Sequence, residues 1–324
     1  MLTDHDAHPP ADAWLCHMRA GRFEDAWRVC DAVLAARNGA PTWHLPRHQQ
    51  AIWNGQPFDG RRVLVRCYHG LGDTIQFIRF APLIESAARE VIVWAQPALL
   101  PLLRTAAGID HLIPLHDGEP DAEYDVDVEV MELGHVFRTT IETIPREIPY
   151  LHARPASIDR DEGVQAGLFW KAGDWEPKRS MPFEALAALA EVPGVRWHVL
   201  QQDAESAGWD GSLGQLSGSE DLTELAGIIR SLDLVITVDS MPAHLAGALG
   251  VPVWTLLHAD ADWRWMADRE DSPWYPTMQL FRQHRAGDWA GLMRRVAKEL
   301  TNRNCGAGFS LPSARQAKAR TTMT

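Results

Sequence analysis

A glycine-containing turn at the end of an apolar segment carries an acidic residue that could act as a base. Residues 62–68 are rich in valine and leucine, and Gly70, Gly72 and Asp73 follow them. Glycines can take backbone angles closed to other residues, so a ligand can approach the main chain where the next helix begins. Asp73 would then lie at the carboxyl edge of a strand, where its carboxylate could remove a proton from an acceptor hydroxyl. The alternative role for Asp73 is that of a helix N-cap.

A second strand-to-helix junction has the composition of an anion site. The apolar residues 232–238 run into Asp239, Ser240 can cap the following helix, and Pro242 is tolerated in its first turn. The free amides of that turn and the positive end of the helix dipole favour a phosphate. His244 could donate to a phosphate oxygen or a leaving group, or it could be a buried histidine. The predicted anion-binding residues are Asp239, Ser240, Met241 and His244.

A loop with three cations lies between these junctions. Lys171, Lys178 and Arg179 follow a strand-like segment and precede an expected helix that Ser180 would cap. Beside a helix N-terminus these cations could neutralise a departing diphosphate, and the alternative is an ordinary solvated loop.

Composition limits the classes of partner. The chain has 324 residues, a net charge of −12 and no apolar run near the roughly 20 residues that span a bilayer. The acidic balance disfavours a nucleic-acid partner. Four scattered cysteines and the lack of an export signal in residues 1–10 favour a soluble, cytoplasmic protein.

The pattern of elements predicts an α/β protein with several units. Residues 11–36 show helical periodicity broken at Gly21, which predicts an antiparallel helical hairpin in a unit of residues 1–60. Two series of alternating strands and helices follow, in units 61–155 and 156–300, with a hinge near 150–163. Helices are expected after Asp73, after Pro97, over 135–144, 182–190, 222–231 and 241–249. Residues 301–324 have the composition of a disordered tail.

Several segments resemble a known enzyme family. HGLGDTIQFIRFAPL, DSMPAHLAGALGVPVW and the later ADWRW, SPWYP and LFRQ pieces are similar to glycosyltransferase family 9, the heptosyltransferase-like group. The fragment GRFEDAWRVCDAVL resembles the second helix of a tetratricopeptide repeat, as in family members fused to such units.

This resemblance implies a GT-B fold, in which two Rossmann-like domains face each other across a cleft. It also implies an inverting mechanism without a metal or other cofactor, with Asp73 as general base. The donor, a nucleotide-diphosphate sugar, would bind the second domain through Lys178, Arg179 and residues 239–244, although Lys171 could replace Lys178. The acceptor would be a glycan, a lipid-linked core or a protein, and the hairpin could recruit a protein partner.

Two features offer alternatives. Asp260 and Asp262 form a DxD pattern that some metal-dependent sugar transferases use, but the same spacing recurs at three other places in this chain. Five aromatic residues could stack on a sugar, although interdomain packing is the favoured interpretation: Trp254, Trp263, Trp265, Trp274 and Tyr275. A nucleotide-sugar epimerase and a non-catalytic interaction module remain the competing functions.

Overall fold

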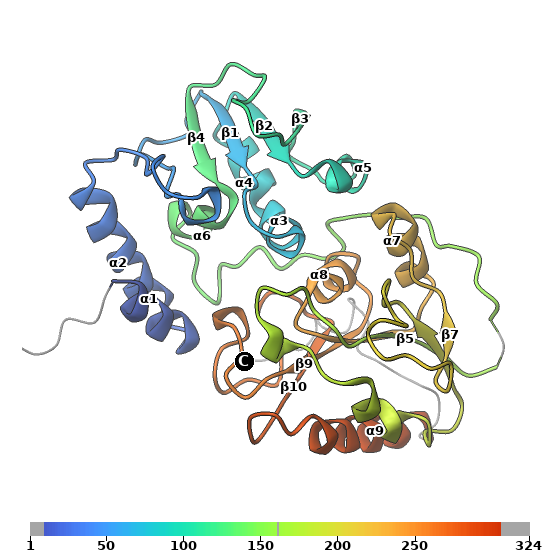
Figure 1. Cartoon of the computed structure of the whole chain (residues 1–324). Helices are drawn as coiled ribbons and strands as arrows, with labels where there is room; N and C mark the ends of the chain where they lie inside the picture. Colours follow the sequence, from blue (N-terminus) through green and yellow to red (C-terminus); the bar gives the residue numbers. More distant parts are fainter. Residues whose placement is uncertain (1–9, 161, 306–324) are drawn as a thin grey trace, which may run out of the picture.

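The computed structural model describes residues 10–160 and 162–305 and contains two separate parallel sheets (Figure 1). The smaller sheet lies in the first half of the chain, and the larger sheet lies in the second half. This is the α/β architecture that the sequence predicts. Among the described residues, no helix has the length and apolar character needed to cross a membrane.

The first sheet has the strand order β3-β2-β1-β4, with all strands parallel. Its strands are β1 (Arg62–Arg66), β2 (Glu90–Ala95), β3 (His111–Pro114) and β4 (Val126–Glu129). Val63 and Val65 are fully buried in the cluster that contains the helices, and Leu64 is fully buried on the other face beside Ile92 and Trp94. The accompanying helical segments are η1 (Arg47–Gln49), α3 (Leu71–Phe77), η2 (Ile78–Phe80), α4 (Ala81–Glu85), η3 (Pro97–Leu99), α5 (Leu100–Leu103), η4 (Val130–Glu132) and α6 (Leu133–Val136).

The second sheet has the order β10-β9-β8-β5-β6-β7 and is also parallel. Its strands are β5 (Val164–Phe169), β6 (Val195–Val199), β7 (Gln215–Leu216), β8 (Leu234–Val238), β9 (Val253–Leu257) and β10 (Met278–Arg282). Its helical segments are η5 (Pro177–Arg179), η6 (Phe183–Leu189), α7 (Leu222–Arg230), α8 (Met241–Ala248), η7 (Trp263–Trp265) and α9 (Trp289–Cys305). The two-residue β7 is exposed and was not predicted, because so short a segment has no periodicity.

The predicted hairpin consists of α1 (Pro10–Arg19) and α2 (Phe23–Ala36). It contacts both halves of the chain. Trp14 packs edge-on against Trp263 at a ring distance of 5.1 Å, and the Trp27 indole donates to the Thr139 carbonyl at 2.7 Å. One face of the hairpin is therefore buried against the body, and its relation to tetratricopeptide fusions stays a prediction.

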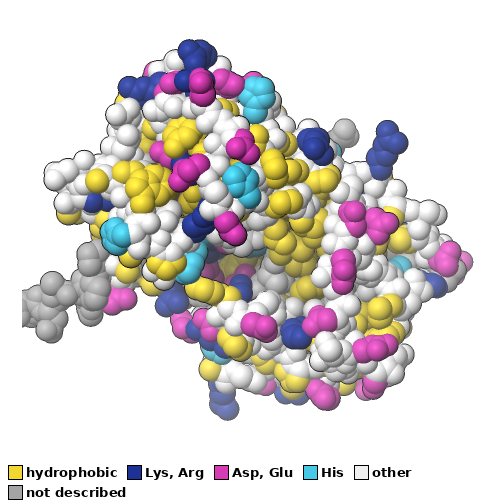
Figure 2. Space-filling view, turned by 45° about the horizontal axis from the view of Figure 1, so that its top comes forward, with side chains coloured by type: hydrophobic (Ala, Val, Ile, Leu, Met, Phe, Trp, Pro, Cys, Tyr) yellow, Lys and Arg dark blue, Asp and Glu magenta, His cyan; other side chains and the backbone are white. Residues whose placement is uncertain are grey.

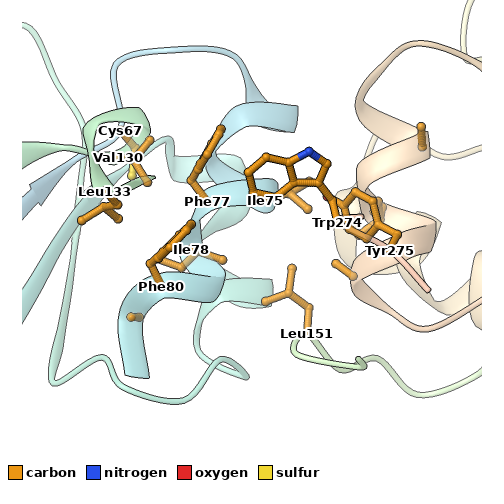
Figure 3. Close-up of a cluster of buried hydrophobic side chains, with 14 of the residues drawn as sticks. Cys67, Ile75, Phe77, Ile78, Phe80, Val130, Leu133, Leu151, Trp274 and Tyr275 are labelled. Carbon is orange, nitrogen blue, oxygen red and sulfur yellow. The ribbon is translucent and has the colours of Figure 1, made fainter. Parts of the chain in front are cut away.

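The two halves share an apolar contact on the side where the chain crosses between them (Figure 3). Phe77 of α3 packs edge-on against Trp274, with ring centroids 5.7 Å apart. Tyr150 and Leu151, at the start of the expected hinge, both donate backbone N–H groups to the Ala248 carbonyl of α8. The linker is thus tied to the second half, and the predicted unit boundaries stay predictions.

Two helix predictions were wrong, one in its extent and one in its type of helix. The helix expected over 135–144 is only Leu133–Val136, because the chain leaves helical geometry at Phe137 and Arg138, whose φ is +50°. The segment at 182–190 is a 3-10 helix from Phe183, and the Ser180 hydroxyl accepts the Ala172 N–H instead of capping it.

The predicted tail begins in a helix that periodicity should have revealed. In α9, Leu292, Met293, Val296 and Leu300 recur at helical spacing and are buried beneath the second sheet, where α9 contacts η6. Residues 301–305 are therefore helical, and 306–324 lie outside the described residues.

Candidate active site between the two sheets

Asp73 lies inside a helix and reaches towards the other half. It is the third residue of α3, whose N-cap is Gly70, so the prediction of a helix beginning after Asp73 was wrong. Its Oδ2 accepts the Gly70 N–H at 2.9 Å, and its Oδ1 accepts from Arg264 at 2.5 Å. One carboxylate therefore closes the helix end and contacts the second half, while a quarter of its side chain stays exposed.

The two glycines of this turn have a different purpose from the one predicted. Gly70 has an ordinary φ of −66°, and Gly72 is not among the positive-φ glycines. A Cβ added to Gly72 would lie 2.9 Å from the His244 ring and 3.5 Å from the Met241 Cα. Gly72 is thus needed for space, because α3 and α8 approach each other closely here.

Asp239 directly follows β8 and is almost completely buried near the charged groups of Asp262, Arg179 and Arg264. Burial raises the pKa of its carboxyl to about 6, and the negative charge of Asp262 acts in the same direction, while Arg179 opposes the rise. Ser240 occupies the N-cap position of α8, but its hydroxyl donates to the Val238 carbonyl at 3.0 Å. The prediction that its side chain caps the helix was therefore wrong.

His244 is a buried histidine in contact with two aromatic side chains. Its Nδ1 lies 3.0 Å from the Tyr275 hydroxyl, and its ring stacks on Trp265 at 5.4 Å. Burial, with the positive charges of Arg264, Arg79 and Arg179, holds the pKa of His244 well below its usual value. The ring is therefore neutral near pH 7, and its role at a phosphate stays a proposal.

The cations of the predicted loop point in different directions. Lys171 pairs with Asp203 at 2.6 Å, beyond β6. Lys178 pairs with Asp260 at 3.2 Å, and Asp260 also binds Arg19 of the hairpin at 3.0 Å. Arg179 lies close enough to Asp239 to lower the pKa of that carboxyl. Of the three, Lys178 and Arg179 are tied to the β8 and β9 ends that carry the candidate site.

Sequence reasoning missed Arg264, a residue of η7 that is buried between the two halves. Its guanidinium donates to Asp73, to Asp262 at 2.9 Å and to the Gln76 side chain at 2.8 Å, and it stacks on Trp263. The ADWRW segment was noted only as a family piece and for its tryptophans. A basic residue between two aromatic residues has no periodic signal, so only the fold reveals its partner.

A second missed group lies beside the Asp73 turn. Glu129, at the end of β4, is buried, and its Oε2 accepts the Met131 N–H at 2.7 Å. Burial raises the pKa of its carboxyl to about 8. The His69 Nδ1 lies 3.4 Å from its other oxygen. The carboxyl edge of the first sheet thus carries two acids, Asp73 and Glu129, in unlike surroundings.

The DxD residues and the aromatic cluster have local partners. Asp260 pairs with Arg19 and Lys178, and Asp262 pairs with Arg264. Within residues 10–160 and 162–305, no group of three or more histidine, cysteine, aspartate or glutamate side chains could hold a metal. All five aromatic side chains of the cluster are buried, in agreement with packing as their role.

These residues bring a carboxylate of the first half close to an anion-favouring helix end of the second half. Figure 2 shows the molecule hollowed between its two lobes. Asp73 comes from the first sheet, and the 239–244 turn and Arg264 come from the second. Such a pair can remove a proton on one side while charge grows on a leaving phosphate on the other.

The sequence comparisons point to one enzyme family. Residues 202–309 match the model of glycosyltransferase family 9 (heptosyltransferase). Protein FlbA of Caulobacter vibrioides is 26% identical over 318 aligned residues, which cover 86% of this chain and 52% of that protein. The chain thus spans about half the length of this curated relative.

Solved structures share the fold at low sequence identity. The ADP-heptose lipopolysaccharide heptosyltransferase II of E. coli superposes with a TM-score of 0.55 at 14% identity, covering 74% of this chain and 98% of that one. The family 9 glycosyltransferase of Veillonella parvula gives 0.53 at 15% identity, covering 82% and 98%. The iron-containing dodecameric glycosyltransferase TibC of enterotoxigenic E. coli gives 0.55 at 14%, covering 76% of each. The chain therefore has a GT-B fold, and its residues 202–309 match the glycosyltransferase family 9 model.

Proposed function

We propose that this protein is an inverting, metal-independent glycosyltransferase that moves a sugar from a nucleotide-diphosphate donor to an acceptor hydroxyl. The observation that carries the proposal is that the candidate base of the first half lies close to the candidate phosphate turn of the second half. Asp73 stands in the first half, and the 239–244 turn stands so close to it that only glycine fits at position 72. The family match over 202–309 supports the same class of reaction.

The proposed mechanism uses direct displacement at the anomeric carbon. Asp73 removes the proton of the acceptor hydroxyl as the new glycosidic bond forms on the face opposite the breaking bond. The departing diphosphate binds at the α8 N-terminus, where the helix dipole and nearby cations stabilise its charge. In this proposal Lys178 and Arg179 supply positive charge, and Lys171 could replace Lys178 only by leaving Asp203. The phosphate turn is lined by Asp239, Ser240, Met241 and His244.

The donor and the acceptor are proposed from a solved relative and from the charge of the chain. A structure of TibC was solved in complex with ADP-D-beta-D-heptose, so ADP is the first nucleotide to test here. The acceptor is a glycan, a lipid-linked core or a protein. We favour a protein or neutral acceptor, because a net charge of −12 repels anionic lipid cores at long range. A cytoplasmic location would match the supply of nucleotide sugars.

Thermal unfolding with ADP, GDP, UDP, CDP and dTDP, each with and without EDTA, tests the donor site. A diphosphate at about 100 times its dissociation constant adds roughly 2.7 kcal/mol to the free energy of unfolding. A selective rise in Tm that survives EDTA supports the proposal. A rise that EDTA abolishes contradicts metal independence, and no rise with any of the five contradicts the donor site.

A further inference from the structure

We propose that Arg264 is exchanged between Asp73 and the donor diphosphate, so that the base becomes free only after the donor has bound. This inference rests on the proposed function and adds an order of events to it. In the free protein Arg264 holds the Asp73 carboxylate. When a diphosphate occupies the α8 turn, the guanidinium moves to it and leaves one Asp73 oxygen available to the acceptor hydroxyl.

The first support is that Arg264 lies between Asp73 and the 239–244 turn. One of its Nη atoms lies 2.5 Å from the Asp73 Oδ1. Its charge also lowers the pKa of His244 and that of Asp239, so it is close to the phosphate turn. The next residue, Trp265, stacks on the His244 ring. The same guanidinium is thus a neighbour both of Asp73 and of the 239–244 turn.

The second support is the balance of charge around it. Asp73, Asp262 and Asp239 all act on Arg264, which has only 9% of its side chain exposed. A diphosphate that bound here would be repelled by these three carboxylates. The Arg264 guanidinium that could attract it is already paired with two of them, Asp73 and Asp262. Binding is favoured if the guanidinium exchanges a carboxylate for the phosphate, because its planar fork of donors fits either group.

The third support is that a hydrogen bond independent of Arg264 fixes the second carboxylate oxygen of Asp73. Its Oδ2 accepts the Gly70 N–H, and this bond does not depend on Arg264. The carboxylate therefore keeps its position when the arginine leaves. Asp262, one-third exposed, stays hydrogen-bonded to the backbone N–H of Arg264 and can keep η7 in place. The exchange must break the bond from the guanidinium to Asp73, and it must break or rearrange the bonds to the Asp262 and Gln76 side chains.

A double-mutant cycle on ADP binding tests the exchange by calorimetry, with the other four nucleoside diphosphates and pyrophosphate as further probes. We expect Arg264→Gln to weaken binding about 10-fold or more, since a hydrogen bond to a charged group is lost. We expect Asp73→Asn to tighten binding about 5-fold, because it frees the guanidinium. In the double variant, Asp73→Asn must no longer tighten ADP binding.

The outcomes separate the exchange from simpler explanations. If Asp73→Asn tightens binding equally with and without Arg264, it acts only by removing negative charge, and the exchange is overturned. If Asp73→Asn leaves the affinity unchanged, Arg264 does not move, and the exchange is again overturned. If the wild type binds none of the probes, the proposed function fails and the exchange fails with it. Arg138→Gln, which breaks an Arg–Asp pair between the first half and Asp31 of the hairpin, is the matched control and should not alter binding.

A measurement on the wild-type protein covers the case in which Arg264→Gln does not fold. The ¹⁵Nε resonance of Arg264, assigned by its loss in Arg264→Lys, must shift when ADP binds. The corresponding resonance of Arg79, another buried arginine at the junction, serves as the internal control and should stay unchanged. A constant Arg264 signal at saturating ADP would overturn the exchange.

Discussion

Two buried arginines cross between the halves of this protein, and their partners differ in kind. Arg79, from η2, donates to the backbone carbonyls of Gln76, Pro145 and Trp274 and to the Tyr150 hydroxyl. Arg264, from η7, donates to the carboxylates of Asp73 and Asp262 and to the Gln76 side-chain oxygen. The first set of acceptors is neutral and mostly backbone, whereas two of the three acceptors in the second set are charged and partly exposed.

This difference suggests different roles for the two contacts between the halves: a structural role for Arg79 and a functional role for Arg264. Backbone carbonyls cannot follow a moving side chain, and leaving them unpaired in a buried place costs free energy. Arg79 also stacks on Tyr275 at 4.5 Å, so it is held on every side. Carboxylates that touch water can exchange partners at lower cost. We infer that the Arg79 side holds the halves together and that the Arg264 side can change with ligand.

The largest expected effect comes from the proposed base. Asp73→Asn keeps the size of the side chain and an oxygen for the Gly70 N–H, but it cannot accept the proton. We expect the transfer rate to fall about 10²- to 10⁴-fold while the free energy of unfolding changes little. Initial rates with a saturating donor and urea unfolding check both parts. Full activity in this variant would end the assignment of Asp73 as base.

Arg79→Met tests whether Arg79 stabilises the contact between the two halves. It leaves several buried acceptors unpaired, and each costs about 1–3 kcal/mol, so we expect about 2–4 kcal/mol of lost stability. Denaturant unfolding measures the loss, and the variant should bind ADP normally under conditions in which it stays folded. A loss below about 1 kcal/mol would show that the junction does not depend on Arg79.

Gly72→Ala tests how closely the two halves meet. Its methyl group would collide with the His244 ring, so α3 and α8 must separate, at a cost of about 1–3 kcal/mol. Gly173→Ala is the matched control, because nothing lies within 4 Å of its added methyl group. Equal unfolding midpoints for the two variants would contradict the close approach.

The smallest expected effect is the pH dependence that Glu129 gives to stability. Burial raises its pKa to about 8 in the folded chain, whereas an exposed glutamate has a pKa near 4.5. The folded state therefore binds more protons between these values, and the free energy of unfolding falls as pH rises from about 5 to 8. The slope cannot exceed about 1.4 kcal/mol per pH unit for one proton. In Glu129→Gln the slope should be smaller over this window, and urea unfolding at several pH values tests this.

Much of the fold and part of the site could be predicted from the sequence. The apolar segments 62–68 and 232–238 contain the strands β1 and β8, because β-branched and apolar residues form short runs between polar turns. The turns around Asp73 and Asp239 were found from glycine, proline and acidic residues next to such runs. Helix ends were less certain, as the early end of α6 and the missed α9 show, because local spacing competes with tertiary packing.

The sequence by itself determined the two parallel sheets, the helical hairpin and the acidic and anion-favouring turns at strand ends. Only the tertiary structure decided which charges meet. Arg264 and Asp73 are 191 residues apart, and no local pattern encodes a contact over such a separation. The need for glycine at position 72, the burial of Glu129 and the neutral surroundings of Arg79 likewise depend on packing between elements, since burial and partner distance set the energy of a charged group.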